Sequence, residues 1–531
     1  MPTWKILDCT LRDGGYYTSW DFSRELVARY LRAVTTFPVE YLELGYRSEL
    51  NQGYLGAYYY LPRALLEWAR SIIPNGPHFA LMLNAKECRS GHVGRLLGDC
   101  RDLVKLVRFA ADPTKLDETL GHCEEVKSAG FEVALNLMYL SKDYDLERVF
   151  GQIAARADLV DHVALVDSFG ACYPDRVGSA VRVAKSILPM PVGFHGHDNV
   201  SLAFANALAA IESGADMIDS TVTGMGRGAG NLRTELIAGY HAKVAGQTID
   251  YRGSTQCLDE FNAMKARYGW GPELPYVVAG LNNLPQAQVM DWLAQDRYST
   301  TAIVGALQRT QAASAHEHPG IAEVGPSKSG APACLIVGGG PTVPGHAEAL
   351  VSWCNQAGIS VIFTGCRYLG TLSGLHTERF VCLVGDEYAR GEAQLLPELP
   401  NVGAVWIDAE AYVAVPEGSP VGQKFAHAGT LVPADGATDA VLGKASPFGV
   451  ALAGALRSGF RRIYLAGFDG YDDASKKAAY LAAETQGLLA RMAADYPAIE
   501  LASVTATRYD VKQTSVYALL SQLGLRDEGH S

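Results

Sequence analysis

The chain has 531 residues, of which 48% are hydrophobic and 19% charged, and its formal net charge is -12 at pH 7. This length allows two or three domains with sizeable cores, and the acidic balance argues against nucleic acid as a partner. No run of about 18 or more apolar residues is present, so no membrane-spanning helix is expected. The ten cysteines form no C-x-x-C pair, which favours reduced thiols in a cytoplasmic protein. The first residues lack the basic head and apolar core of a signal peptide.

Short apolar runs alternate with longer helical patterns from the start of the chain. Eight of these runs predict strands, at Lys5–Cys9, Tyr41–Leu44, Phe79–Leu83, Leu103–Phe109, Glu132–Asn136, His162–Val166, Pro191–Phe194 and Met217–Ser220. Eight strands that alternate with helices are what an α/β fold of the (β/α)8, or TIM-barrel, type requires. Polar residues after the strands are expected at the catalytic mouth, and they are Arg12, Asp13, Glu43, Asn84, Asn136, Ser168, His195 and His197.

Two histidines, His195 and His197, lie two positions apart after the seventh predicted strand. Residues i and i+2 of an extended strand project from the same side, so both imidazoles point together. With Asp13 from another strand end they form a two-histidine, one-carboxylate set, which suits a divalent metal and leaves positions for substrate and water. The histidine pair alone is equally compatible with a structural role, and the triad alone also fits an Fe(II) oxygenase.

Five motifs follow one another along the first part of the chain. They are Asp8–Gly15 (DCTLRDGG), Tyr41–Gly45 (YLELG), Val163–Gly170 (VALVDSFG), His195–Asn199 (HGHDN) and Gly224–Asn231 (GMGRGAGN). In this order they resemble the DRE-TIM metallolyase superfamily, the barrel enzymes that include 4-hydroxy-2-oxovalerate aldolase, hydroxymethylglutaryl-CoA lyase and isopropylmalate synthase. The resemblance covers about residues 1–310.

The resemblance implies a divalent-metal-dependent carbon–carbon lyase, or aldolase. It would act on a 2-oxo acid and an aldehyde through a pyruvate-type enolate held by the metal. Asp13, His195 and His197 are the expected metal ligands, with Asn231 as a fourth, and the ion is Mn, Mg, Co or Zn. Arg12 is expected to stabilise the negative charge of the enolate oxygen.

Further roles are expected for the neighbours of this set. Glu43 pairs with Arg12 or orients metal-bound water, and Ser168 and Asn136 bind the substrate. Tyr16 stands where the related aldolases have a histidine general base. Because an unperturbed phenol has a pKa of about 10, it is a poor base at neutral pH. Tyr16 therefore relays a proton with help from the metal or Arg12, or donates its hydroxyl to a larger, sugar-like acceptor.

The glycine-rich loop separates the alternatives within the superfamily. It lacks the cysteine of the hydroxymethylglutaryl-CoA lyases, and it has Arg227-Gly228 where the acyl-CoA synthases carry a Glu-Arg pair. The aldolase form is the most similar. An acyl-CoA-dependent Claisen condensation and a non-catalytic binding scaffold remain as alternatives.

The domain organisation is expected to follow changes in composition. Residues 1–235 form the barrel and residues 236–310 a helical extension of the same catalytic unit. Residues 311–331 are small, polar and interrupted by Pro and Gly, which predicts a linker. His316 and His318 form another H-x-H there. A solvent-exposed pair is preferred to a metal site, because a linker holds ligands poorly.

We also expect the protein to form a homo-oligomer.

Residues 332–531 begin a second α/β pattern, expected to be a Rossmann-like domain. Its predicted strands are Ala333–Val337, Ile359–Phe363, Phe380–Val384, Val405–Ile407 and Ile463–Ala466. The first is followed by Gly338, Gly339 and Gly340, and a glycine turn between a strand and a helix exposes N–H groups where phosphate binds. The alternative is that these glycines only permit a tight turn.

Three parts of this pattern resemble the Rossmann-like domains of bacterial surface-glycan proteins. They are the strand with its GGGP turn, Ser446–Phe448 and the late element Gly467–Tyr471. The resemblance implies a nucleotide or nucleotide sugar as partner, and a role in specialised or surface-carbohydrate biosynthesis.

Overall fold

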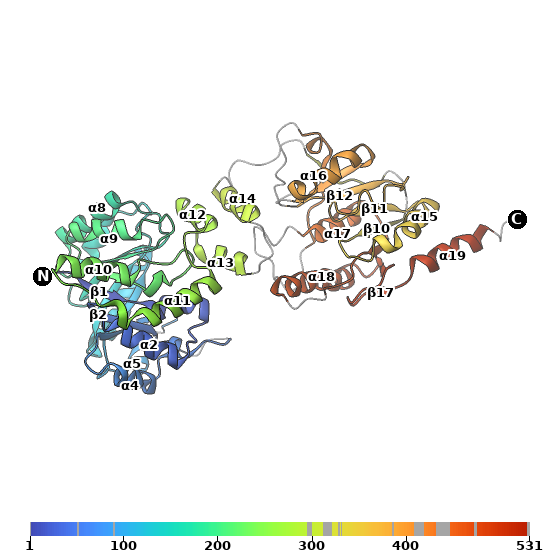
Figure 1. The fold of residues 1–531 in the computed structure, drawn as a ribbon. Coiled ribbons are helices and arrows are strands. Elements are labelled where there is room, and N and C mark those ends of the chain that lie inside the picture. Colours follow the sequence, from blue (N-terminus) through green and yellow to red (C-terminus); the bar gives the residue numbers. More distant parts are fainter. Residues whose placement is uncertain are drawn as a thin grey trace. The chain divides into compact units, whose positions relative to one another are not determined.

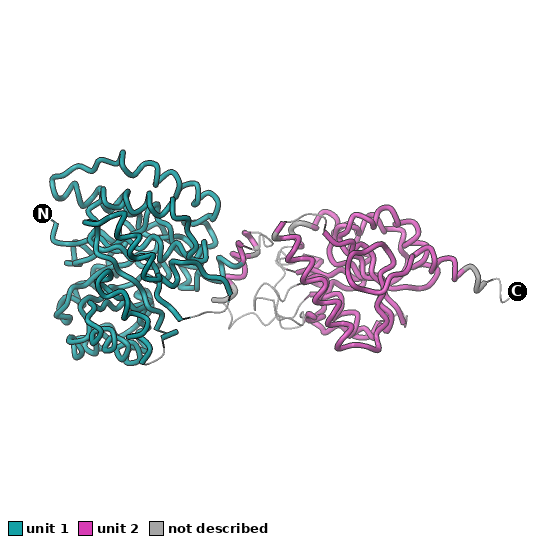
Figure 2. The backbone as a smooth tube through the Cα atoms, turned by 90° about the horizontal axis from the view of Figure 1, so that it is seen from below, with its two compact units in different colours: residues 1–291 teal, residues 292–531 magenta. Residues whose placement is uncertain are grey.

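The chain divides into two compact units, Met1–Asp291 and Trp292–Ser531 (Figure 2). The structure is a computed structural model that describes residues 2–49, 53–85, 87–88, 91–294, 300–311, 321–327, 330, 332–384, 387–407, 419–431, 446–471 and 475–527. The division falls inside residues 236–310. Helix α14 (Thr300–Gln311) therefore belongs to the second unit, although the sequence placed it with the barrel. His316 and His318 lie outside the described residues.

The first unit is a closed barrel of parallel strands, which confirms the expected α/β barrel (Figure 1). Its strands are β1 (Lys5–Asp8), β2 (Val39–Tyr46), β3 (His78–Leu83), β4 (Val104–Ala111), β5 (Glu132–Leu137), β6 (His162–Asp167), β7 (Val192–Gly196) and β8 (Met217–Ser220). Each strand pairs with the next along the chain, and β1 closes the barrel on β8 in the register Asp8 to Ser220. All carboxyl ends therefore meet at one mouth.

Helices surround the barrel, and the last of them form the helical extension. They are α1 (Thr10–Thr18), α2 (Arg24–Val34), α3 (Ala57–Tyr60), α4 (Arg63–Ile72), α5 (Val93–Leu97), α6 (Leu116–Ser128), α7 (Leu146–Ala154), α8 (Pro174–Ile187), α9 (Ala203–Glu212), α10 (Thr234–Val244), α11 (Thr255–Tyr268), α12 (Leu274–Leu281) and α13 (Gln286–Ala294), with short 3-10 turns at η1 (Pro113–Lys115), η2 (Val222–Gly224) and η3 (Tyr251–Gly253). A large apolar core lies between strands and helices, and a smaller one, which includes Leu7, Tyr41 and Leu106, fills the barrel interior.

The second unit contains an open sheet whose paired strands are all parallel. Its order is β17-β16-β15-β10-β11-β12-β13-β14-β9. The strands are β9 (Ala322–Glu323), β10 (Ala333–Val337), β11 (Ser360–Phe363), β12 (Arg379–Cys382), β13 (Ala404–Ile407), β14 (Phe425–His427), β15 (Arg462–Ala466), β16 (Glu500–Ser503) and β17 (Lys512–Gln513). Chain order reverses beside β10, because β11 pairs on one side of it and β15 on the other.

Successive apolar side chains of β10 point to opposite faces of the sheet and belong to two separate cores. Leu335 and Val337 belong to one core, and Cys334 and Ile336 belong to the other. This alternation is the period of a strand buried on both faces. The helices of this unit are α15 (Ala347–Ala357), α16 (Glu387–Glu398), α17 (Pro447–Arg457), α18 (Lys476–Asp495) and α19 (Val516–Asp527), with η4 (Pro344–His346), η5 (Leu399–Asn401) and η6 (Gly422–Lys424).

Part of the expected linker belongs to the second sheet. Ala322–Glu323 forms β9 and pairs in parallel with β14. The N–H of Val324 donates to the carbonyl of His427 (2.9 Å), and that of Ser327 donates to the carbonyl of Ser458 (3.1 Å). Polar, Pro/Gly-punctuated composition predicted a linker here, because β9 is too short for any apolar alternation to show.

The ten cysteines are all free thiols. Among the described helices, none combines the length and the apolar character needed to cross a membrane.

Candidate active site

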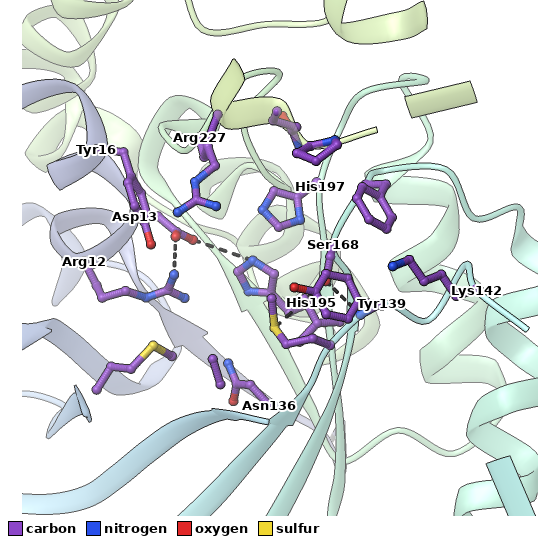
Figure 3. A pocket seen from close by; sticks show the side chains of 18 of the residues that line it. Arg12, Asp13, Tyr16, Asn136, Tyr139, Lys142, Ser168, His195, His197 and Arg227 are labelled. Atoms are coloured by element: carbon purple, nitrogen blue, oxygen red, sulfur yellow. Dashed lines mark hydrogen bonds and ion pairs between the residues drawn. The ribbon is translucent and has the colours of Figure 1, made fainter. Parts of the chain in front are cut away.

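A cavity of about 260 Å³ lies at the carboxyl ends of the barrel strands (Figure 3). Most of the residues that the sequence singled out line it, namely Arg12, Asp13, Tyr16, Asn136, Ser168, His195 and His197. Glu43 and Asn231 lie behind this lining, and each contacts a residue in it. Asn84 is outside the lining, and its side chain donates to Glu87 (2.7 Å).

Helix α1 carries three of the lining residues, Arg12, Asp13 and Tyr16. Asp13 thus lies on a helix that begins directly after β1, and not at the strand end that the sequence suggested. Residues three and four apart share one face of a helix, so Tyr16 is on the same face as Arg12 and Asp13. The motif's glycines allow close packing: a Cβ on Gly15 would lie 2.1 Å from the Trp20 ring.

Both histidines are held through their Nδ1 atoms. His195 Nδ1 lies 3.0 Å from a carboxylate oxygen of Asp219, and His197 Nδ1 lies 2.8 Å from the carbonyl oxygen of Asp167. The two rings are 5.0 Å apart, and His195 Nε2 is 3.6 Å from Asp13 Oδ2. Burial, with His195 adding to it, lowers the pKa of His197 to about 3. The ring is therefore neutral at neutral pH, which is the form that binds metals.

Asp13 lies at the centre of the candidate ligand set. It forms an ion pair with Arg12 and accepts a hydrogen bond from Asn231 Nδ2 (2.7 Å). Burial opposes ionisation, but Arg12 and the two histidines outweigh it, so the pKa of Asp13 is lowered. Asn231 Oδ1 is buried and has no hydrogen-bond partner among the described residues. A carboxylate, two imidazoles and an unused amide oxygen fit a divalent ion.

A buried ionic network links Arg12 to His195. Arg12 Nε donates to Glu43 (2.7 Å), and the other oxygen of Glu43 lies 3.5 Å from Arg108. Arg108 in turn donates to Asp219, the partner of His195. Although burial opposes it, Arg108 and His195 lower the pKa of Asp219 to about 2. Glu43 therefore positions Arg12 and is not in the cavity lining.

Arg108 and Asp219 were not predicted from the sequence. Arg108 is only 2% exposed, and it also donates to Asn136 Oδ1 (3.0 Å). Its signal was present in the sequence as a charge in the middle of the mostly apolar strand β4, which also carries Lys105 near its start. Asp219 gave a weaker signal, as the only charged residue of β8.

A second set of three metal-binding side chains lies next to the first. Cys9, His195 and Asp219 bring one ligand atom each within 4.8 Å of one another. Neither Cys9 nor Asp219 lines the cavity. Asp219 is already paired with Arg108, and the Cys9 thiol donates to the carbonyl of Ser220 (3.5 Å). The set around Asp13 is therefore the better candidate.

Part of the cavity lining is aromatic and cationic, with Tyr16, Tyr46 and Arg227. The hydroxyls of Tyr16 and Tyr46 are 3.2 Å apart, and burial raises the pKa of Tyr46, so that phenol stays protonated. The guanidinium carbon of Arg227 lies 3.8 Å from the centre of the Tyr16 ring. Ser168 Oγ accepts a hydrogen bond from the N–H of Tyr139 (2.8 Å).

Comparison with known proteins shows the family to which the barrel belongs. Residues 102–257 match the HMGL-like family. The chain is 32% identical to the 4-hydroxy-2-oxovalerate aldolase of Chloroflexus aggregans over 279 residues, 52% of this chain and 78% of the relative. It is also 32% identical to the enzyme of that name from Thermomicrobium roseum, over 51% of this chain and 74% of the relative. This chain belongs to the HMGL-like, DRE-TIM aldolase family.

A solved structure extends the family comparison to the fold. The N-terminal domain of a "putative aldolase" from Bacteroides vulgatus is 40% identical, with a TM-score of 0.53, and the match covers 57% of this chain and 99% of that domain. The DRE-TIM aldolases depend on divalent metals. The barrel is therefore the catalytic unit of a metal-dependent aldolase, a carbon–carbon lyase.

The glycine turn of the second unit departs from the expected phosphate cradle. The N–H groups of Gly338 and Gly340 donate to the carbonyls of Ala466 and Gly467, each at 2.8 Å. Among the described contacts, only the N–H of Gly339 is left without such an acceptor. The turn leads into η4 and only then into α15. It borders a cavity of about 290 Å³ that Arg367 also lines.

Proposed function

We propose that the barrel catalyses reversible aldol cleavage, in which a 4-hydroxy-2-oxo acid gives a pyruvate-type 2-oxo acid and an aldehyde. Asp13, His195 and His197 hold a divalent ion, with Asn231 as the fourth ligand. The observation that carries this proposal is the pair of histidines fixed through Nδ1, with Nε2 of His195 directed at Asp13 in the cavity. The family comparison supports the reaction class.

The side chains have separable roles in this reaction. The bound ion would supply Lewis acidity toward the oxygens of the 2-oxo acid. Arg12, fixed between Asp13 and Glu43, stabilises the negative charge on the enolate oxygen. Ser168 and Asn136 contact the substrate.

In the cleavage direction, one proton leaves the 4-hydroxyl group and one is added to C3, and Tyr16 is the proposed relay. The 4-hydroxyl group loses its proton while the bond between C3 and C4 breaks, and C3 is then protonated. Tyr16 relays the proton, with its hydroxyl next to that of Tyr46.

Isotope exchange tests the enolate step without any aldehyde. Loaded with Mn, Mg, Co or Zn in turn, the enzyme is expected to exchange the methyl protons of pyruvate for solvent deuterium. Arg12→Ala should slow this exchange by roughly 10²–10³-fold, the loss seen when one donor to an oxyanion is removed. Arg252→Ala is the control, because Arg252 is exposed and pairs with Asp250. Exchange no faster than with the ion in buffer contradicts the proposal, and release of free CoA from an acyl-CoA identifies the Claisen alternative.

We further propose that the second unit binds a nucleotide or nucleotide sugar, which places the enzyme in specialised or surface-carbohydrate biosynthesis. The cavity at the ends of β10 and β11 supports this, because it combines the free N–H of Gly339 with the cation of Arg367. A Cβ on Gly339 would meet only Arg367, at 4.0 Å. Gly339→Val should therefore abolish binding without unfolding the unit. Calorimetry with CMP, CDP, UDP, GDP and their sugars tests this, and no binding to the wild-type chain contradicts it.

A further inference from the structure

Two cations of the barrel cavity form no ion pair with a carboxylate among the described residues. Arg227 and Lys142 both line the cavity, and Figure 3 shows them on either side of the histidines. Neither forms an ion pair with a carboxylate within the part of the chain that the structure describes. Arg12, by contrast, pairs with both Asp13 and Glu43. The positive charge of Arg227 and Lys142 is therefore available to a ligand.

Aromatic rings hold these two cations in place without neutralising them. Arg227 lies 3.8 Å from the centre of the Tyr16 ring. The Nζ atom of Lys142 is 4.6 Å from the ring of Tyr139 and 5.4 Å from that of Phe169. A cation on an aromatic face is oriented and keeps its charge. Such an arrangement suits recognition of an anionic group.

A third polar side chain of the cavity, from the helical extension, has one amide nitrogen without a partner among the described residues. Gln286, the first residue of α13, lines the cavity and is 4% exposed. Its Oε1 accepts a hydrogen bond from the N–H of Ala229 (3.1 Å), which fixes the orientation of the amide. Its Nε2 is buried and has no partner among the described residues. A buried donor without an acceptor is destabilising, and an oxygen of a ligand would supply that acceptor.

These three groups are not used by the 2-oxo acid. In the proposed reaction the metal set and Arg12 bind its oxygens. We propose that the second substrate is an aldehyde with a terminal anionic group, a carboxylate or a phosphate, that Arg227 and Gln286 bind while Lys142 attracts it at the mouth. This inference rests on the proposed function, and it names the class of aldehyde.

The anionic group contributes to binding only and takes no part in the chemistry. In the addition direction, a proton leaves C3 of the 2-oxo acid, and C3 forms a bond to the carbonyl carbon of the aldehyde. The carbonyl double bond becomes single, and its oxygen takes up one proton as the new hydroxyl. Atoms and charge balance without any further reactant.

Matched pairs of aldehydes test the inference on the metal-loaded full chain. The carboxylate arm compares 4-oxobutanoate with butanal, and the phosphate arm compares glyceraldehyde 3-phosphate with glyceraldehyde. Wild-type kcat/KM for addition to pyruvate should be roughly 10–100-fold higher for the anionic member of at least one pair, the size of one hydrogen bond to a charged group. The arm with the larger ratio identifies the anion.

Two substitutions then assign this preference to residues. Arg227→Met should bring the ratio close to one. Gln286→Glu keeps the oxygen that accepts from Ala229 but faces the anion with a carboxylate, so it should lower the ratio even where Arg227→Met fails to fold. Arg252→Met, far along the chain on η3 and exposed, should keep the wild-type ratio.

The results separate the inference from the proposed function. Deuterium exchange into pyruvate together with equal rates for both members of each pair overturns the inference and leaves the aldolase proposal intact. A ratio that neither substitution lowers also overturns it. Absence of both exchange and addition overturns the proposed function, and the inference with it.

Discussion

The imidazoles of the candidate metal site owe their orientation to groups behind them. Asp219 accepts from His195, and the carbonyl of Asp167 fixes His197. Partners of this kind set the tautomer and raise the basicity of a metal-binding histidine. Asp219 is itself held ionised by Arg108, so the strength of the site depends on a residue that no ligand touches.

Loss of the histidines should remove the metal. Because the proposed site holds one ion, His195→Ala and His197→Ala are each expected to lose one divalent ion per chain. Elemental analysis of the purified variants measures this. Unchanged metal content in both variants would show that the ion is bound elsewhere.

Weakening the partner of His195 should weaken the metal site without abolishing it. Asp219→Asn keeps a carbonyl oxygen for His195 but removes the charge that pairs with Arg108. Metal affinity is expected to fall roughly 10–100-fold, measured by calorimetric titration of the metal-free chain. Asp250→Asn serves as the control, since Asp250 is a surface residue. Equal affinities in Asp219→Asn and wild type would exclude a positioning role.

At the scale of elements, the glycine turn after β10 lets two backbone segments approach each other closely. In the second unit, a Cβ on Gly338 would lie 2.6 Å from the carbonyl oxygen of Gly467, whereas one on Gly339 has free space. The glycines of this turn therefore have different functions: Gly338 permits β10 and β15 to end side by side, and Gly339 borders the cavity.

Alanine should lower stability at Gly338 but not at the neighbouring Gly339. Gly338→Ala forces backbone to move and should lower the free energy of unfolding by about 1–3 kcal/mol, whereas Gly339→Ala should leave it unchanged. Thermal unfolding of the full chain provides the comparison. Equal melting temperatures for both variants would contradict the packing described here.

At the scale of the whole molecule, each unit has its own sheet and its own cores. The second unit also takes in residues that precede β10. Strand β9 covers the edge of β14, and Glu323 of β9 pairs with Arg457. An uncovered sheet edge is a site for association with other chains.

Fragments of the second unit with and without β9 should therefore differ in stability and in self-association. A fragment of residues 312–531 retains β9, whereas one of residues 332–531 lacks it together with the contacts of Val324 and Ser327. Both are expected to fold, with a lower melting temperature and more self-association for the shorter one. Circular dichroism and light scattering measure these properties. An identical melting temperature for the two fragments would show that β9 adds nothing.

Local patterns in the sequence were enough for the barrel and for much of the site. The run Phe79–Leu83 lies within the observed β3, because a buried strand leaves an apolar run of about its own length. His195 in β7 and His197 directly after it both reach the cavity, because residues two apart in extended backbone project from the same side. Strands β9, β14, β16 and β17, of two to four residues each, were not predicted.

Only the tertiary structure decided which distant groups meet. Arg108 and Asp219 are 111 positions apart, and their contact depends on barrel closure between β1 and β8 as well as on the strands between them. Gln286 reaches the cavity from the helical extension, and no local pattern marks that approach. Sequence periodicity reports which side of an element is buried, whereas the identity of the neighbour across the core is set by the packing of all the elements together. The chain thus predicted that Asp13, His195 and His197 would line one cavity. It did not predict the groups behind them, nor those proposed to bind the second substrate.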